Sequence, residues 1–435
     1  MSRIIESGPD YFAAELMRTG RRRAWISRDS DTGAYRASDP LAQEIADFLT
    51  ADTRDCRDHE AIFLQVDQTS GALFGAFLHC TLRGQAQGGL RRWDYARLED
   101  VLRDGLRLSL GMTRKNALAS LWWGGGKGLI ACGRSVCDDP GARRDLYLAF
   151  GAFVSSLHGC YLTAEDVGTT PTDVAEVYRG TRFVTCLPPE IGGSGNPSEH
   201  TAGGVVCAME AALESLGEGS LAGKTIAIQG MGHTGTFLTQ RLLERGAGAI
   251  VASELSDVRC AEALEAFRGA PVDIRVSSPG DASILTEACD ILAPCALGGI
   301  LDDKTIPQIR AKIVCGSANN PLAEQGRDDV ALAERDILYV PDYVANRMGI
   351  VSCGNEQYGK LADDPQIARH LSRDWPEGVY QITLHVLDVA RREGITTVAA
   401  ANRLADERAQ ELHPIWGDRA RRIVVSRACE EWVQG

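Results

Sequence analysis

Two lysines flank the stretch of this chain with the clearest potential for chemistry. Lys115 and Lys127 lie on either side of an apolar segment that ends in the glycine triplet 124–126. Glycine has no Cβ, so a ligand can approach the main chain closely at such a triplet. A lysine that lies near a second cation and is partly removed from water has a lowered pKa, which favours general-base chemistry. The alternative from these residues alone is a glycine-rich turn followed by a surface lysine.

A glycine fingerprint in the second half of the chain is the next chemical signal. The segment Gly230-Met231-Gly232-His233-Thr234-Gly235 follows a predicted apolar strand, 224–229, and opens a predicted helix that ends near Arg245. In this pattern the glycines allow a tight turn and bring a pyrophosphate onto the helix N-terminus. Glu254, placed 24 residues after Gly230, is suited to accept hydrogen bonds from ribose hydroxyls. A plain βα turn is the alternative, but the combined pattern favours a dinucleotide site.

An acidic pair, Glu165-Asp166, lies on a predicted loop at 161–170. Acidic residues on loops are commonly solvated and have no chemical role. From the residues alone, both interpretations of Asp166 therefore stay open.

The elements that must position these groups change along the chain. A hairpin is predicted from 61–66 and 72–81, and helical spacing begins at Leu98 and returns at 143–157. A flexible run at 192–197 predicts a domain boundary. Strands then alternate with helices, which implies a parallel, doubly wound sheet. These strands are predicted at 224–229, 249–252, 290–293, 311–315 and 337–340.

The C-terminal part of the chain is predicted to be helical. One apolar stripe is closed by Gly394 as a probable C-cap, and Thr397 can cap the following helix, which ends near Leu412. We therefore predict a two-domain α/β protein. Its parts are an N-terminal extension (1–55), a substrate-binding and catalytic domain (56–195), a Rossmann domain (196–355) and a C-terminal helical region (356–435).

Composition narrows the class of function. The 435 residues are 44% hydrophobic and 24% charged, as in ordinary globular proteins, and the net charge of -13 argues against nucleic acid or anionic membranes as partners. No apolar stretch of about 18 residues predicts a membrane span, and the N-terminus lacks a signal-peptide core. The 13 cysteines form no C-x-x-C pair and no Cys/His cluster. We expect a cytoplasmic protein without a bound metal.

Five blocks of residues together resemble a known family. The blocks are Gly111-Met112-Thr113-Arg114-Lys115-Asn116, Gly124-Gly125-Gly126-Lys127, 163–169, 293–299 and 316–320. The chain resembles the glutamate/leucine/phenylalanine/valine dehydrogenases, and most closely their leucine and phenylalanine branch, over roughly residues 58–425. The resemblance implies an N-terminal α/β substrate and oligomerisation domain, a Rossmann domain, and C-terminal helices that pack back across the cleft. It also implies a homo-oligomer.

The activity implied by the resemblance is reversible oxidative deamination of an L-α-amino acid to the 2-oxo acid and ammonia, with NAD. Lys127 and Asp166 match the catalytic lysine and aspartate, and Lys115 matches the residue that binds the α-carboxylate. The other implied substrate-binding residues are Gln87, Gly88, Met112, Gly125, Ala164, Asn319, Ile350 and Cys353. The implied cofactor-binding residues are Thr201, Gly230, Gly232, His233, Thr234, Gly235, Ser253, Glu254, Ala296, Asn319 and Asn346.

The chemistry of these side chains fits the implied reaction. A neutral Lys127 can activate the water that attacks the substrate iminium, and Asp166 can move the amino-group proton. One alternative is a catalytically silent, dinucleotide-binding regulatory protein of the same fold, which would need neither group. A hydroxy-acid dehydrogenase is another, but it usually uses a histidine base, and His233 within the fingerprint is the only histidine near these motifs.

Two departures from the family bear on specificity. Gln87 stands where leucine-type enzymes have an apolar residue and glutamate-type enzymes have a lysine, so glutamate should be a poor substrate. Gln87 either turns away to bond the backbone or reads a polar or aromatic group, and we expect an apolar or aromatic amino acid. Glu254 would repel a 2′-phosphate, which favours NAD over NADP, although an ungapped match places Ser253 at the acidic position.

Overall fold

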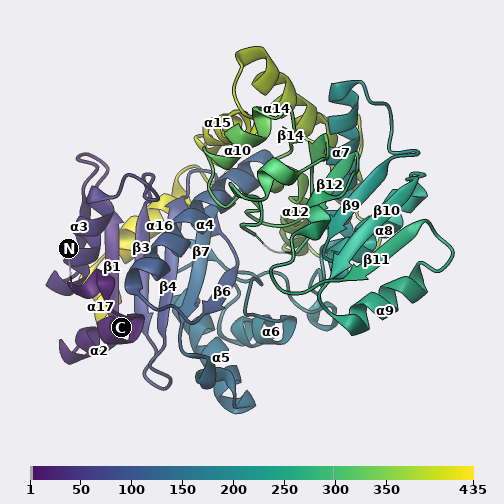
Figure 1. Ribbon diagram of the computed structural model, residues 1–435. Coiled ribbons are helices and arrows are strands. Elements are labelled where there is room, and N and C mark those ends of the chain that lie inside the picture. Colours follow the sequence, from purple (N-terminus) through teal and green to yellow (C-terminus); the bar gives the residue numbers. More distant parts are fainter. Residues whose placement is uncertain (1–2, 297) are drawn as a thin grey trace. The chain divides into compact units, whose positions relative to one another are not determined.

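The computed structural model describes residues 3–296 and 298–435 and divides into two compact units (Figure 1). The first unit comprises Met1–Gly195, Glu356–Lys360 and Asp406–Gly435. The second comprises Asn196–Asn355 and Leu361–Ala405. Leu297, which belongs to the resemblance block 293–299, lies outside the described residues.

The first unit is built around an eight-stranded mixed sheet in the order β2-β1-β3-β4-β7-β5-β8, with β6 paired to β7. Its strands are β1 (Arg23–Arg28), β2 (Tyr35–Ala37), β3 (Ala61–Val66), β4 (Leu73–Cys80), β5 (Ala86–Gln87), β6 (Leu90–Trp93), β7 (Gly124–Ala131) and β8 (Tyr161–Leu162). Its helices are α1 (Arg3–Glu6), α2 (Pro9–Arg18), α3 (Pro40–Ala51), α4 (Leu98–Leu118), α5 (Pro140–Ser156), α6 (Pro171–Gly180), α16 (Arg419–Arg427) and α17 (Glu430–Gln434), with 3₁₀ turns η1 (Arg134–Cys137) and η2 (Pro189–Ile191).

The N-terminal segment 1–55 is part of this unit. It contributes β1, which pairs antiparallel with β3, and three helices around that edge of the sheet. Asp39 begins α3 as an N-cap, because its carboxylate accepts from the backbone N–H groups of Leu41 and Ala42. The predicted hairpin is confirmed, since β3 and β4 pair antiparallel from Ala61 to Val66.

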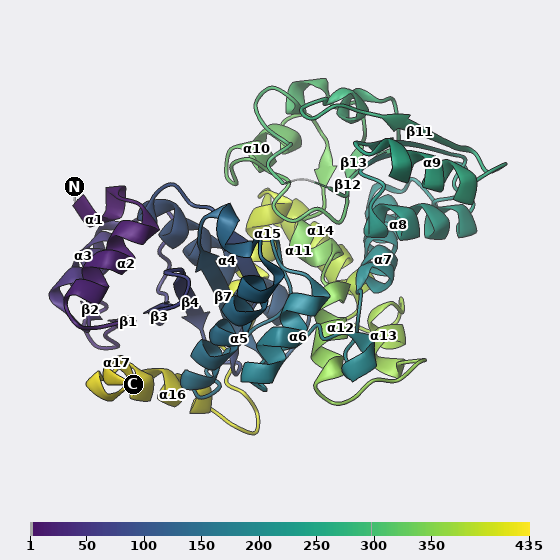
Figure 2. The same ribbon diagram turned by 90° about the horizontal axis from the view of Figure 1, so that it is seen from below.

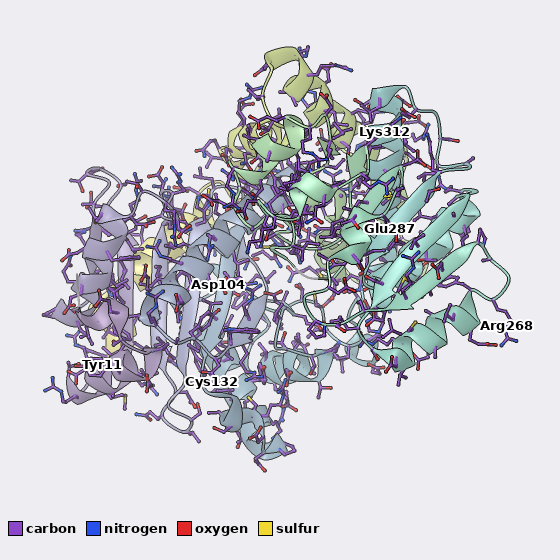
Figure 3. The ribbon with its side chains drawn as sticks, in the orientation of Figure 1. Tyr11, Asp104, Cys132, Arg268, Glu287 and Lys312 are labelled. Carbon is purple, nitrogen blue, oxygen red and sulfur yellow. The ribbon has the colours of Figure 1, made fainter. Side chains whose placement is uncertain are left out.

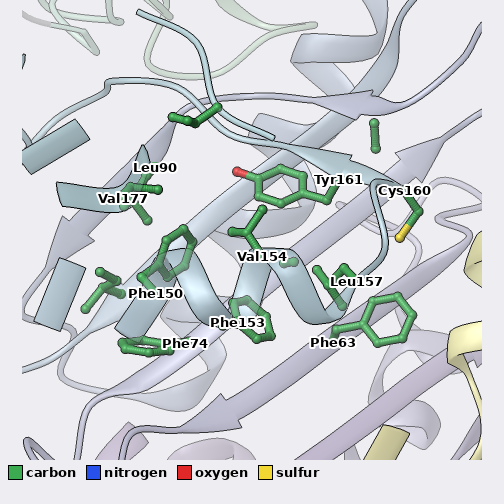
Figure 4. Packing of buried hydrophobic residues seen from close by; sticks show 14 of the residues in the cluster. Phe63, Phe74, Leu90, Phe150, Phe153, Val154, Leu157, Cys160, Tyr161 and Val177 are labelled. Atoms are coloured by element: carbon green, nitrogen blue, oxygen red, sulfur yellow. The ribbon is translucent and has the colours of Figure 1, made fainter. Parts of the chain in front are cut away.

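Hydrophobic cores cover both faces of the sheet, so β3 is buried along its whole length. Side chains alternate between the faces: Ile62 packs in the core with α2, α3 and α4, whereas Phe63 packs in the core with α5. Figure 4 shows the second core, in which Phe150 and Phe153 of α5 lie against Phe74. The helices α5 and α6 lie side by side on this face (Figure 2).

The glycine triplet lies inside β7 and not in a turn, so the alternative of a glycine-rich turn followed by a surface lysine does not hold. A Cβ on Gly125 would lie 2.0 Å from Thr113 Oγ1 of α4, and a Cβ on Gly126 would lie 2.9 Å from Tyr161 Cδ2 on the opposite face. Real Cβ atoms do not approach other atoms this closely. The missing side chains therefore allow α4 and the neighbouring strands to pack against β7, and the freed space is filled by the protein itself.

The second unit contains a six-stranded parallel sheet in the order β11-β10-β9-β12-β13-β14. Numbered along the chain from β9, this is the order 3-2-1-4-5-6 of a doubly wound dinucleotide-binding sheet, as predicted. Its strands are β9 (Thr225–Gln229), β10 (Ala249–Glu254), β11 (Val272–Val276), β12 (Ile291–Pro294), β13 (Ile313–Val314) and β14 (Leu338–Tyr339). The edge strand β11 was not predicted, because most of its side chains are exposed and it has no apolar run.

Helices complete the second unit. They are α7 (Ser198–Leu216), α8 (His233–Glu244), α9 (Asp257–Ala266), α10 (Asp328–Ala333), α11 (Asp342–Ala345), α12 (Met348–Glu356), α13 (Pro365–His370), α14 (Val379–Glu393) and α15 (Thr397–Ala409), with 3₁₀ turns η3 (Ser283–Thr286) and η4 (Ile306–Gln308). Gly394 ends α14 in a left-handed conformation, φ 64°, which confirms it as the C-cap. The predicted cap at Thr397 is wrong: Thr396 accepts from the N–H of Ala399, whereas the Thr397 hydroxyl donates to Tyr339 O.

Candidate active site

The first unit brings Lys127 and Asp166 into direct contact. Lys127 is only 4% exposed on β7, and its Nζ donates to Asp166 Oδ2. Asp166 lies on the loop after β8, where its backbone N–H donates to Thr169 Oγ1 at 2.9 Å and the same hydroxyl donates back to Asp166 O. This local turn fixes the carboxylate toward the strand. Asp166 is therefore not one of the solvated loop acids that the sequence left open.

The electrostatics of this pair suit proton transfer. Burial lowers the pKa of Lys127, with help from the nearby guanidinium of Arg91 and against the attraction of Asp166. Burial by itself would raise the pKa of Asp166, but the charges of Lys127 and Arg91 together hold it below its ordinary value. A buried lysine that gives up its proton readily, beside a carboxylate that stays ionised, can act as a general base.

Helix α4 carries two of the predicted substrate-binding residues, Met112 and Lys115, and Asn116 from the same block. Met112, Lys115 and Asn116 share one face because residues three and four apart are neighbours on a helix. Lys115 and Met112 are partly exposed, whereas Asn116 is buried and donates to Gly124 O at 2.6 Å. The block therefore lies on a helix, and it does not form a loop around the glycines.

Gln87 is fully buried on β5, where it pairs with Gly125. Its Oε1 accepts from Asn116 Nδ2 at 3.4 Å, and its Nε2 has no hydrogen-bond partner among the described residues. The orientation of both amides is fixed, because Asn116 must present its N–H₂ to the carbonyl of Gly124. Gln87 thus keeps a buried donor unused. The sequence left two possibilities for Gln87, a hydrogen bond to the backbone or contact with a substrate group. The structure shows no hydrogen bond from Gln87 Nε2 to the backbone among the described residues.

Two further predicted residues lie around β5 and β6. A Cβ on Gly88 would lie 1.7 Å from Gly126 O, so Gly88 lets two strands approach closely. Ala164 is buried and lines a small, mainly apolar void together with Leu90, Thr163 and side chains of α5 and α6.

Three residues next to the lysine–aspartate pair were not predicted from the sequence. Arg91 Nε lies 3.4 Å from Asp166 Oδ2, and its Nη1 donates to both oxygens of Asp104, at 3.0 and 3.1 Å. The hydroxyl of Tyr95 donates to Asp104 Oδ2 at 2.6 Å. A signal for Arg91 was present in the sequence: alternation along an extended segment places residues 87, 89 and 91 on one face of the sheet.

In the second unit the glycine fingerprint adopts the geometry that a pyrophosphate needs. Gly230 has φ +97°, and a Cβ on Gly235 would lie 2.0 Å from Gly230 O, so these two glycines serve the turn and the packing of α8. A Cβ on Gly232 would meet nothing closer than Arg259 Nη1, at 4.0 Å. The backbone of Gly232 is therefore open to a ligand at the start of α8, beside His233 and Thr234. The residues fit a dinucleotide.

Glu254 lies at the end of β10 and contacts the fingerprint directly. Its Oε2 accepts from the N–H of Met231 at 3.0 Å, and its Oε1 accepts from the N–H groups of Leu255 and Ser256. The Ser253 carbonyl accepts from Gly230 N–H at 2.8 Å. Both Ser253 and Glu254 are therefore next to the first glycine, and Glu254 is the residue whose charge lies there.

The remaining predicted cofactor residues follow the ends of neighbouring strands. Ala296 comes after β12 and would be only 2.6 Å from a Cβ on Gly230. Asn346 is buried, and its Nδ2 donates to Asn319 Oδ1 at 2.9 Å and to Ser317 O at 3.1 Å. Asn346 Oδ1 has no partner among the described residues, so it is available to a ligand. Thr201 lies on α7 and donates to Pro197 O.

Two predicted substrate-binding residues, Ile350 and Cys353, are buried on α12. In the described part of the chain, no three His, Cys, Asp or Glu side chains are arranged to hold a metal ion. Likewise, no helix within residues 3–296 or 298–435 is long and apolar enough to span a membrane.

Comparisons with known proteins identify the family. A family model described as Glu/Leu/Phe/Val dehydrogenase, dimerisation domain, matches residues 63–183, and one described as Glutamate/Leucine/Phenylalanine/Valine dehydrogenase matches residues 192–415. The leucine dehydrogenase of Geobacillus stearothermophilus is 41% identical over 82% of this chain and 92% of its own length. The valine dehydrogenase of Streptomyces virginiae is 40% identical, over 80% and 93%.

A solved structure is similar as well. The L-tryptophan dehydrogenase from Nostoc punctiforme superposes with a TM-score of 0.66 at 33% identity, covering 84% of this chain and 97% of that one. The matches extend through both units and include the lysine–aspartate pair and the glycine fingerprint. The chain therefore belongs to the glutamate/leucine/phenylalanine/valine dehydrogenase family and is an amino-acid dehydrogenase.

Proposed function

We propose that this protein catalyses the reversible, NAD-dependent oxidative deamination of an L-α-amino acid with an apolar or aromatic side chain. The observation that carries the proposal is the contact between Asp166 and Lys127, a buried lysine that lies between two glycines on β7. Neutral Lys127 accepts a proton from the attacking water, and Asp166 moves the proton of the substrate amino group. Lys115 binds the α-carboxylate. A bound nicotinamide supplies hydride acceptance.

The proposed substrate class draws on both the relatives and the charge pattern. The relatives are named for leucine, valine and L-tryptophan. Gln87 occupies the position where a lysine would pair with a side-chain carboxylate, and burying an unpaired charge there would cost several kcal/mol in effective terms. A silent regulatory protein would have no need of a buried lysine–aspartate pair. The test is NADH formation with a panel of L-leucine, L-valine, L-phenylalanine, L-tryptophan and L-glutamate. Activity on glutamate alone, or on none of them, contradicts the proposal.

The choice of NAD over NADP is proposed from Glu254. Its carboxylate is 8% exposed and is held against the fingerprint by three backbone N–H groups, so a 2′-phosphate would meet a fixed like charge. We expect Glu254→Gln to raise the ratio of NADP to NAD kcat/KM by about tenfold or more. The exposed Glu262→Gln on α9 is the matched control and should leave the ratio unchanged. A parent enzyme that uses NADP as well as NAD would contradict this assignment.

The unused donor of Gln87 gives a prediction about specificity. If Nε2 faces the substrate side chain, Gln87→Leu should move the preference toward leucine and valine by about 1–3 kcal/mol, the usual penalty of an unsatisfied buried polar group. The readout is the kcat/KM ratio of L-leucine to L-tryptophan and L-phenylalanine. Gln85→Leu is the control, because the Gln85 amide donates to Gly159 O and is already satisfied. An unchanged ranking for Gln87→Leu would show that this residue does not read the side chain.

A further inference from the structure

Arg91 connects the lysine–aspartate pair to α4 through a chain of charges. Starting at the loop before α4, Tyr95 donates to Asp104, which accepts from Arg91 with both oxygens. Asp104 projects from α4, where Figure 3 labels it. Arg91 Nε then forms an ion pair with Asp166 Oδ2 at 3.4 Å, and that oxygen accepts a hydrogen bond from Lys127. Five side chains from five segments thus form one continuous polar path.

The strand pairing explains why Arg91 reaches this position. It lies on β6, which runs parallel to β7, and its Cα is opposite Leu129, two residues beyond Lys127. Leu129 and Lys127 face the same side of the sheet, and Arg91 shares that side. A side chain from the neighbouring strand is therefore held beside Asp166 without any contribution from flexible loops.

A single carboxylate oxygen, Asp166 Oδ2, is close to two cations. One of these, Lys127, must lose its charge to accept a proton from water. The other is a guanidinium, which stays charged throughout the accessible pH range. When Lys127 becomes neutral, Asp166 therefore still has a cation 3.4 Å away. The same cation repels a proton on Lys127.

We propose that Arg91 is a positioning residue that keeps the Asp166 carboxylate ionised and oriented while Lys127 changes its protonation state. Asp104 and Tyr95 hold the guanidinium in place for this task. The inference rests on the proposed roles of Lys127 and Asp166 in the reaction. A purely structural alternative is that Arg91 ties β6 to α4 and has no effect on the proton chemistry.

Other charged and titratable groups also affect the pH dependence of the Lys127–Asp166 pair. Asp104 acts on Lys127 in the opposite sense to Arg91 and raises its affinity for a proton. Three further titratable groups interact with Asp166. They are Tyr95 before α4, Glu165 on the same loop and Tyr161 on β8.

The test compares pH profiles of kcat/KM for deamination, measured with NAD and the best substrate of the amino-acid panel. Arg91→Gln should move the ascending limb to higher pH by about one unit or more, since an opposite charge is lost from Asp166 and a like charge from Lys127. Arg91→Lys keeps a cation, so the ascending limb of its profile should lie nearer to that of the parent than the limb of Arg91→Gln does. Its kcat should also be higher than that of Arg91→Gln.

Arg103→Gln is the matched control. Arg103 precedes Asp104 on α4 and forms ion pairs with Asp52, Asp55 and Glu99. Its loss should therefore lower the thermal stability without moving the ascending limb of the pH profile. Circular dichroism and thermal unfolding of every variant separate folding from chemistry. If Arg91→Gln does not fold, Arg91→Met, which also removes the charge but keeps the length of the side chain, takes its place in the comparison.

The outcomes distinguish this inference from the proposed function. A profile of the charge-removing Arg91 variant that overlays the parent, or equal shifts for that variant and Arg91→Lys, overturns the role of Arg91 and leaves the assignment of Lys127 unchanged. A parent enzyme without activity on the panel, or a Lys127→Ala variant with normal turnover, overturns the proposed function itself.

Discussion

Replacing Lys127 with alanine is expected to lower kcat for deamination by about 10²–10⁴-fold, the usual contribution of a positioned general acid or base. The Lys127 side chain is buried and contacts Asp166, so a lysine on the protein surface cannot take over its role. Asp166→Asn should have an effect of similar size. Binding of NAD should persist in both variants, because the glycine fingerprint lies in the other unit. The measurement is steady-state kcat together with NAD affinity by fluorescence titration.

Comparison with two other lysines sharpens this expectation. Lys115→Ala should raise KM strongly, because it removes binding of the carboxylate already present in the ground state. Lys312→Ala, an exposed residue of the second unit that pairs with Glu218, should change neither parameter. Turnover of Lys127→Ala within about threefold of the parent would contradict the assignment of the base.

Gly125→Ala should strongly lower the stability. Its Cβ would lie 2.0 Å from Thr113 Oγ1, 2.2 Å from Thr113 N and 2.5 Å from Ser109 O, and two of these are backbone atoms that cannot rotate away. Either β7 or α4 must move, at a cost of about 3 kcal/mol or more. We expect insoluble protein or a fall in Tm of about 6 °C or more, read by differential scanning calorimetry.

Gly111→Ala is the matched control for that variant. Gly111 lies in the interior of α4, and a Cβ there meets nothing within 4 Å. Alanine should therefore leave the stability unchanged or raise it by up to about 1 kcal/mol through its higher helix propensity. Equal Tm values for Gly125→Ala and the parent would show that β7 and α4 do not pack as closely as the structure has them.

Several features could be predicted from the sequence because each depends on local order. The strand, fingerprint and helix at 224–245 follow each other within one βα unit, and their spacing alone indicates the doubly wound sheet. The hairpin at 61–80 and the C-cap at Gly394 are equally local. The sequence blocks also identified Lys127 and Asp166 as candidates, although they lie 39 residues apart.

Other features were decided by contacts between distant segments. The glycine triplet has the composition of a turn, but it is extended because β4, β5 and β6 pair with β7 and α4 needs the space of the missing side chains. Short-range signals cannot show such crowding. The segment 1–55 had no clear pattern by itself, and it is ordered by the pairing of β1 with β3.

The polar path around Lys127 shows the same division. Arg91, Asp104 and Tyr95 each have an ordinary place in the sequence, on a short strand, a helix and a loop. Only the packing of α4 across β6 and β7 brings their charges beside Asp166. By itself the sequence pointed to Lys127 and Asp166 as the candidate reacting groups, because both belong to recognisable blocks. The tertiary structure decided their electrostatic environment, because charges act through space between segments that are separate along the chain.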